Sequence, residues 1–156
     1  MPPESSRRAE EDALRHGIVA RHERMANGEV RFRLLAKDGT GYVRTHSGES
    51  GASQNSHYHK TALETYVVQR VWAAFAELAD GEVEWHVLRP GDVYTTHPGV
   101  AHNIYLPANA IIHTVKHGEE TIDGDWQAAE ELDLLTKHVG EEVLLGIGIH
   151  LSRGET

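Results

Sequence analysis

Between residues 30 and 117 the chain alternates short apolar stretches with turn sequences. Stretches such as VRFRLLA, EVEWHVL and AIIHTVK are rich in β-branched and other apolar residues, and Asp-Gly or Pro-Gly pairs separate several of them. Turn pairs of this kind connect neighbouring strands, and no helical period fits the block. The sequence therefore predicts an all-β domain over residues 30–117, built as an antiparallel sandwich or barrel.

The two flanking segments follow different patterns. Residues 1–29 are polar and charged, and they predict an N-terminal arm or short helix. In residues 118–156 the stretch DWQAAEELDLLTKHV places four apolar residues at helical spacing: Trp126, Ala129, Leu132 and Leu135. We expect a C-terminal helix here, anchored by Trp126 and packed on the outside of the barrel. The stretch EEVLLGIGIHL after it fits a strand or a second short helix.

Composition narrows the classes of function. The 156 residues suit one domain, and 24 acidic against 15 basic residues give a formal net charge of −9. Nucleic acids and anionic membranes bind basic faces, so neither is an expected partner. The chain has no cysteine, no apolar run long enough to span a membrane and no signal-peptide pattern near its start. We therefore expect a soluble, cytoplasmic protein.

Histidine is the residue type that stands out, with 12 in the chain. In SHYHKTALE, His57 and His59 are two residues apart and share one face of a strand. Glu64 follows after a bend, and His102 lies on a later strand. A closed sheet turns one face of each strand inward, so these groups can meet inside the barrel. The set suits one divalent ion, Fe(II), Mn(II), Ni(II) or Zn(II). The alternative is a polar barrel mouth whose histidines bind no metal.

Two motifs in the chain resemble those of the cupin superfamily. The first is Gly51, five residues, HYH at 57–59, four residues and Glu64, and the second runs from Gly91 to PGVAH at 98–102. The resemblance covers about residues 30–117. It implies a small single-domain cupin, a jelly-roll β-barrel, with metal ligands at His57, His59, Glu64 and His102.

The chain departs from the cupin pattern at three positions outside this ligand set. Val71 stands where the first motif ends in glycine, so we expect that turn to be built differently. His97 stands where proline is expected, and Leu106 stands where asparagine is expected. Asn103, directly after His102, is not the equivalent of that asparagine. The departures affect the predicted loop geometry rather than the predicted ligands.

Two further residues are candidates for the polar part of the pocket. Tyr66 shares the face of Glu64, and His113 lies on the last predicted barrel strand. Together with Glu64 they are the candidate catalytic residues, because each can accept or donate a proton beside a bound ion. The simpler interpretations are a core tyrosine and a surface histidine.

Charged and aromatic residues elsewhere give weaker indications. Three arginines lie on early predicted strands, and any that faces inward indicates an anionic substrate: Arg31, Arg33 and Arg44. Their simpler interpretation is an outer, solvated face. His97 lies in a turn and is expected at the surface. Trp72, Phe75 and Trp85 are expected to pack in the barrel wall.

The cupin resemblance implies several functions rather than one. We expect a metal-dependent enzyme that acts on a small metabolite, with dioxygenase-like chemistry as the first interpretation. A metal-dependent sugar isomerase, epimerase or lyase is the second interpretation. A cupin that binds a small ligand without catalysis is the third. Exposed strand edges also lead us to expect a homodimer.

Overall fold

The turn sequences of the chain close hairpins between its strands. In this computed structural model, which describes residues 4–117 and 125–153, β7 (Ala73–Ala79) pairs antiparallel with β8 (Glu82–Leu88). Asp80 and Gly81 connect them with φ values of 52° and 79°. Two successive positive φ angles are required by the tight turn that best matches the twist of paired strands. The predicted hairpin at Asp80-Gly81 is confirmed.

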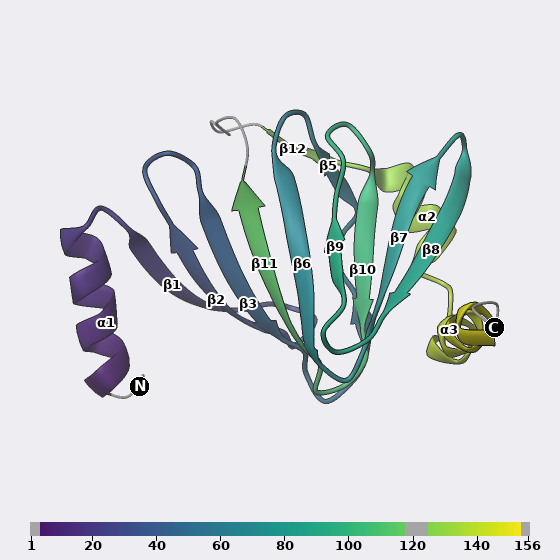
Figure 1. Cartoon of the computed structure of the whole chain (residues 1–156), viewed down its shortest axis with the longest axis horizontal. Helices are drawn as coiled ribbons and strands as arrows, with labels where there is room; N and C mark the ends of the chain where they lie inside the picture. The colour runs from purple at the N-terminus through teal and green to yellow at the C-terminus, as the bar shows by residue number, and fades with distance from the viewer. Residues whose placement is uncertain (1–3, 118–124, 154–156) are drawn as a thin grey trace.

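Two antiparallel sheets face each other and enclose the core (Figure 1). The first has the order β1-β2-β3-β11-β6-β9, with β1 Val19–Arg24, β2 Val30–Leu35, β3 Gly41–His46, β11 Ile111–His117, β6 Leu63–Arg70 and β9 Val93–Thr95. The second has the order β12-β5-β10-β7-β8, with β12 Trp126–Ala128, β5 His57–His59 and β10 His102–Leu106, and β4 (Ala52–Ser53) also pairs with β10. This is a jelly-roll sandwich, and the predicted all-β fold is confirmed.

The core between the sheets follows from the alternation of side chains along each strand. Phe75, Ile104, Leu106 and Ile112 are buried there, with at most 1% of their surface exposed. Trp72 and Trp85 pack on the other side of the second sheet, beside Tyr105. Phe75 therefore fills the barrel as expected, whereas the two tryptophans line the contact with the C-terminal helices.

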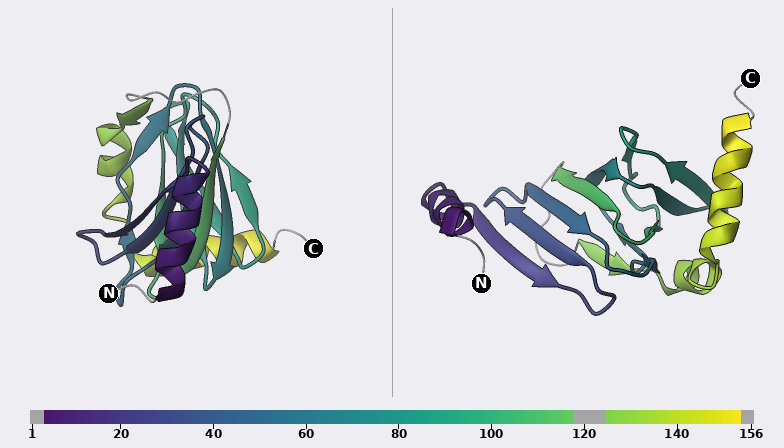
Figure 2. Two further views of the ribbon diagram at one scale, coloured as in Figure 1. Left: turned by 90° about the vertical axis from the view of Figure 1, so that its left-hand side faces the viewer. Right: turned by 90° about the horizontal axis from the view of Figure 1, so that it is seen from below.

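Helices lie at both ends of the molecule (Figure 2). α1 (Glu4–Arg15) precedes β1, and β1 pairs with β2 along its whole length, so the segment interpreted as an arm adds a strand to the first sheet. At the other end α2 (Glu130–Thr136) and α3 (Glu141–Arg153) pack outside the second sheet through Leu132 and Leu144.

The C-terminal helix does not begin where its apolar spacing predicts. Trp126 lies on β12, which pairs with β5, and α2 starts only at Glu130. The expectation that Trp126 anchors a helix is therefore wrong, because this stretch adds a strand to the second sheet. The expected boundary between residues 117 and 118 borders residues 118–124, which lie outside the described part.

The turn at Val71 is built as a glycine would build it. Val71 has a φ of 72°, in the left-handed region that β-branched residues rarely adopt. The expectation of a differently built turn is wrong, since the backbone keeps this conformation with valine in place.

Among the described residues, no helix is long and apolar enough to cross a lipid bilayer.

Candidate metal centre

Three short strands place the four candidate ligands at one end of the barrel. His57 and His59 are the ends of β5, Glu64 is the second residue of β6, and His102 begins β10 directly opposite His57. Each residue offers one nitrogen or oxygen, and these four atoms lie within 4.8 Å of one another. The period of two along each strand thus brings together the four residues that the sequence indicates.

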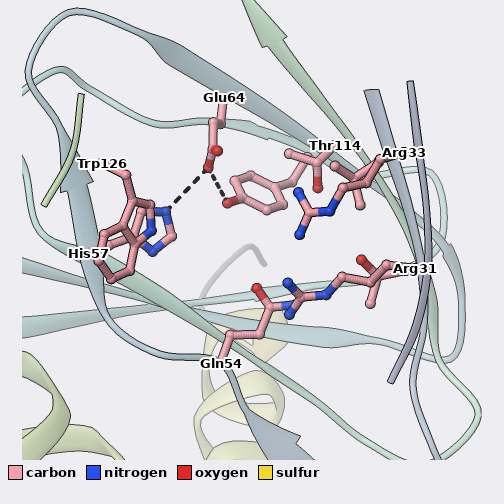
Figure 3. A pocket seen from close by; sticks show the side chains of 10 residues that line it. Arg31, Arg33, Gln54, His57, Glu64, Thr114 and Trp126 are labelled. Atoms are coloured by element: carbon pink, nitrogen blue, oxygen red, sulfur yellow. Dashed lines mark hydrogen bonds and ion pairs between the residues drawn. The ribbon is translucent and has the colours of Figure 1, made fainter. Parts of the chain in front are cut away.

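Glu64 lies at the centre of the cluster. Its Oε1 is 3.0 Å from Nε2 of His59, and its Oε2 is 3.5 Å from Nε2 of His102 and 3.8 Å from Nε2 of His57. The Tyr66 hydroxyl donates a hydrogen bond of 2.5 Å to Oε2. Figure 3 shows this carboxylate facing His57.

The outer nitrogen of each imidazole is already occupied. Nδ1 of His57 lies 3.1 Å from the carbonyl oxygen of Asn55, and Nδ1 of His102 lies 3.0 Å from that of Val100. A carbonyl oxygen only accepts, so Nδ1 carries the proton in both rings and Nε2 presents a lone pair to the centre. Nδ1 of His59 lies 3.1 Å from Oδ2 of Asp125. Partners of this kind orient histidines that bind metal ions.

One of the ligand atoms that face the centre has no hydrogen-bond donor. Nε2 of His102 is buried and has no hydrogen-bond partner in the described part of the chain. With its proton on Nδ1, this atom and the Glu64 carboxylate face each other as two acceptors. Leaving the buried His102 nitrogen unpaired costs free energy, and a cation between it and the carboxylate would remove that cost. The donor set of three imidazoles and one carboxylate therefore fits a divalent ion.

The electrostatics agree with an ionised carboxylate at this position. Burial by itself would raise the pKa of Glu64, but the neighbouring histidines, His102 first, hold that pKa well below its usual range. Burial raises the pKa of Tyr66 well above its usual range, and the charge of Glu64 raises it further. Tyr66 is therefore a neutral donor that fixes the orientation of Glu64.

Helix α2 supports the two ligand strands from behind. Asn103, next to His102, donates hydrogen bonds of 2.7 Å to Ser56 Oγ and 2.6 Å to Thr136 Oγ1. The backbone N–H of Ser56, next to His57, donates to Oδ1 of Asp133 over 2.9 Å. Strands β5 and β10 are thus tied to one helix directly beside their ligands.

A cavity of about 170 Å³ opens in front of the cluster. His57, Glu64 and Tyr66 form one side of it, and Arg31 and Arg33 reach into it from β2 (Figure 3). Arg31 pairs with the buried Glu29 at 2.5 Å, and Arg33 pairs with Glu23 at 2.7 Å. The ring of Trp126 stacks on His57 with 5.5 Å between centroids.

Several predicted residues lie elsewhere. His113 is on the outer face of β11, where its ring nitrogens contact the Tyr42 hydroxyl at 2.7 Å and Gln69 at 2.5 Å, whereas Thr114 faces the cavity. The prediction that His113 lies in the pocket is therefore wrong. The side chains of β11 that point inward are those of the residues on either side of His113. Arg44 also faces outward, with its guanidinium 5.7 Å from the Phe32 ring. His97 is exposed, as expected for a turn residue.

Sequence reasoning missed Asp125 and the position of Trp126. Asp125 contacts His59 through Oδ2, while Oδ1 accepts from the backbone N–H groups of Lys60 and Thr61 at 3.0 and 3.1 Å. Its 66-residue separation from His59 gives no local signal. Only the pairing of β12 with β5 brings the two together.

The fold is shared with solved structures of oxalate decarboxylase from Bacillus subtilis. The structure at pH 4.6 superimposes with a TM-score of 0.60 and 18% identity over 94% of this chain and 42% of that one. The chain has a cupin fold. Another structure of the same enzyme, from work on the EPR parameters of its Mn(II) centres, gives a TM-score of 0.58 and 18% identity, over 81% of this chain and 34% of that one.

The similarity of this chain to known proteins is structural. No family model matches its sequence, and no curated protein is similar to it in sequence. The chain spans about a third to two fifths of the length of the oxalate decarboxylase chains. The likeness therefore supports the fold. The evidence for metal chemistry in this chain is its own cluster of three histidines and one glutamate.

Proposed function

We propose that this cupin domain binds one divalent metal ion through His57, His59, Glu64 and His102 and acts there on a small anionic metabolite. The observation that carries the proposal is the orientation of the imidazoles. Nδ1 of His57 and His102 is bonded outward to carbonyl oxygens, so both Nε2 lone pairs face the Glu64 carboxylate. Such a buried group of acceptors attracts a cation. The same group would cost free energy if it were only part of an apolar core.

The preference for an anion rests on Arg31 and Arg33. Both guanidinium groups line the cavity that contains Glu64, although the whole chain is acidic. Arginine offers several N–H donors in a planar array that matches a carboxylate or phosphate. We infer that these donors orient an anionic substrate whose oxygen atoms face the ligand cluster.

The chain's own residues account for binding and orientation. The bound ion would supply redox or Lewis-acid chemistry. Tyr66 holds the Glu64 carboxylate in place, Asp125 orients His59, and Trp126 forms an apolar wall beside His57. Glu64 and Tyr66 line the cavity and can hold or donate a proton there.

Two reaction classes are compatible with this arrangement. Dioxygenase-like chemistry is the first, because three imidazoles and one carboxylate would hold a redox-active ion such as Fe(II) or Mn(II), which would supply that chemistry. A lyase that releases carbon dioxide is the second, favoured by the inward arginines and by the likeness to an Mn(II) oxalate decarboxylase. Oxygen consumption and carbon dioxide release, measured with a panel of small carboxylates, catechols and enediols, separate the two classes. A fully metallated protein that turns over none of them would contradict an enzymatic role.

The metal itself is tested by elemental analysis of the purified protein. His57→Ala and His102→Ala should each lose most of the bound ion, because removing a ligand lowers affinity steeply. His97→Ala is the matched control, since this histidine is exposed in the turn before β10 and should leave the metal content unchanged. Full metal content in both ligand variants would overturn the proposed site.

A further inference from the structure

A second cluster of metal-ligating side chains lies on the β7–β8 hairpin. Glu77 is the register partner of Glu84, and Phe75 is the partner of His86, so these residues share the face that turns toward the barrel interior. Glu77, Glu84 and His86 each offer one oxygen or nitrogen, and the three atoms lie within 4.8 Å of one another. None of these residues belongs to the cluster around Glu64.

Two buried atoms of this second cluster have no hydrogen-bond partner in the described part of the chain. Glu77 is only 8% exposed, and its Oε1 has no hydrogen-bond partner among the described residues. Nε2 of His86 is likewise buried without a partner, and it lies 3.9 Å from Oε2 of Glu77, too far for a hydrogen bond. A buried carboxylate oxygen without a donor is costly, and a bound cation would remove that cost.

The surroundings of Glu77 supply no compensating positive charge from lysine or arginine. In the described part of the chain, no ion pair joins Glu77 or Glu84 to either residue type. The Tyr94 ring packs on His86 at 5.0 Å and on Phe75 at 4.4 Å between centroids. Burial, followed by a hydrogen bond to Glu77, raises the pKa of Tyr94 above its usual range, so this neighbour is a neutral donor.

The two clusters are neighbours but separate. Glu77 is the register partner of His102, and the Phe75 ring, stacked 5.6 Å from the His102 ring, lies between that ligand and Tyr94. Glu84 is exposed, so the second cluster can be reached from solvent without passing through the cavity lined by Arg31 and Arg33.

We propose that Glu77, Glu84 and His86 bind a second divalent cation, independently of the ion held by the histidines around Glu64. Two carboxylates and one imidazole are a donor set for Mn(II) or Zn(II), with water completing the coordination. Because one ligand is exposed, this ion exchanges more readily than the one at the enclosed centre.

Stoichiometry of Mn²⁺ binding tests the proposal. Metal-free protein is dialysed against a series of free Mn²⁺ concentrations, and bound metal is measured by elemental analysis. We expect two ions for the wild type and one ion for Glu77→Gln. Glu84→Gln removes an exposed ligand with little risk to folding, and it should weaken the second ion about tenfold or more. The exposed Glu142→Gln, on α3, is the matched control and should bind like the wild type.

A variant of the first site makes the two proposals distinguishable. His57→Ala should lose the ion at the Glu64 cluster and keep the one at Glu77, with one ion bound in total. A wild type that binds a single ion, lost in His57→Ala and retained in both glutamate variants, would overturn the second site and leave the first intact. Unchanged binding of two ions in Glu77→Gln and Glu84→Gln would overturn it as well.

Discussion

Oδ2 of Asp125 lies 3.1 Å from Nδ1 of His59, on the side of the ring opposite Glu64. The imidazole is thereby held between two carboxylates, one of which belongs to the ligand cluster. Asp125 is 8% exposed at its side chain and also accepts two backbone N–H groups, so its position is fixed by the bend after β5. A residue outside the ligand set thus controls how one ligand is presented.

Asp125→Asn should lower the affinity for Mn²⁺ about 10- to 100-fold. The amide oxygen can still accept from the backbone, but the charge that orients His59 is lost. The affinity is measured by titration of metal-free protein. Asp133→Asn is the control, because the partners of Asp133 among the described residues are the backbone N–H of Ser56 and Lys137 rather than an imidazole. Equal losses in both variants would show that strand support, not the His59 contact, is responsible.

The same carboxylate should make the stability of the metal-free protein depend on pH. Burial would raise the pKa of Asp125, but the N–H of Thr61 and the charge of His59 bring it below 3.8, its ordinary value. The unfolded chain therefore takes up this proton at higher pH than the folded one. The stabilisation is complete above that ordinary value and is lost as the pH falls through the folded pKa. In urea unfolding, the difference between wild type and Asp125→Asn should shrink under acid conditions, and a constant difference would contradict this.

Val71→Gly should stabilise the protein by about 1 kcal/mol, because the left-handed backbone strains valine and not glycine. Val71 is 39% exposed, so little buried surface is lost. Urea unfolding of the metal-free protein measures the change. Val71→Ala keeps a Cβ in the same conformation and should gain less. A glycine variant less stable than the wild type would show that the valine side chain outweighs the strain.

Gly51→Ala should destabilise the protein by about 1–3 kcal/mol through overpacking. A Cβ at this position would clash with the Tyr105 hydroxyl and lie 2.7 Å from its Cζ. Tyr105 donates a 2.6 Å hydrogen bond to Glu141, so the clash also disturbs the docking of α3. Thermal unfolding checks the effect against Gly140→Ala, where an added Cβ has no atom within 4 Å. Equal effects of the two substitutions would argue against a steric role for Gly51.

Arg33→Met should raise the KM for an anionic substrate about tenfold or more while metal content stays unchanged, because a charge-assisted contact is lost. Steady-state kinetics with any substrate identified from the panel provides the measurement. Arg44→Met removes a charge from the opposite face of the same sheet and serves as the control. A KM that responds equally to both substitutions would indicate a general charge effect.

The ligand cluster could be predicted because the strand pattern and the motif spacing agree there. His57 and His59 alternate with Tyr58 on one strand, and the spacing to Glu64 and His102 matches two cupin motifs. The prediction for His113 was wrong because no such agreement between signals exists on its strand. Its strand carries apolar residues at both parities, so periodicity could not decide which face turns inward. The structure decides it through Thr114.

Trp126 shows where local pattern misleads. Its spacing to Leu132 fits a helix. In the structure, however, residues 126–128 form a strand that pairs antiparallel with β5. Tertiary pairing overrode helical propensity, as it often does at the ends of elements. The expected homodimer and the cytoplasmic location stay predictions.

The return of β12 to β5 has a consequence for biosynthesis. Strand β5, which carries His57 and His59, is only three residues long. Its outer pairing partner is β12, and Asp125, which contacts His59, lies 66 residues after that histidine. A nascent chain that ends at β11 holds every ligand of the proposed ion but leaves the edge of β5 bare. The contacts that support His59 from outside therefore form only after synthesis has passed β12.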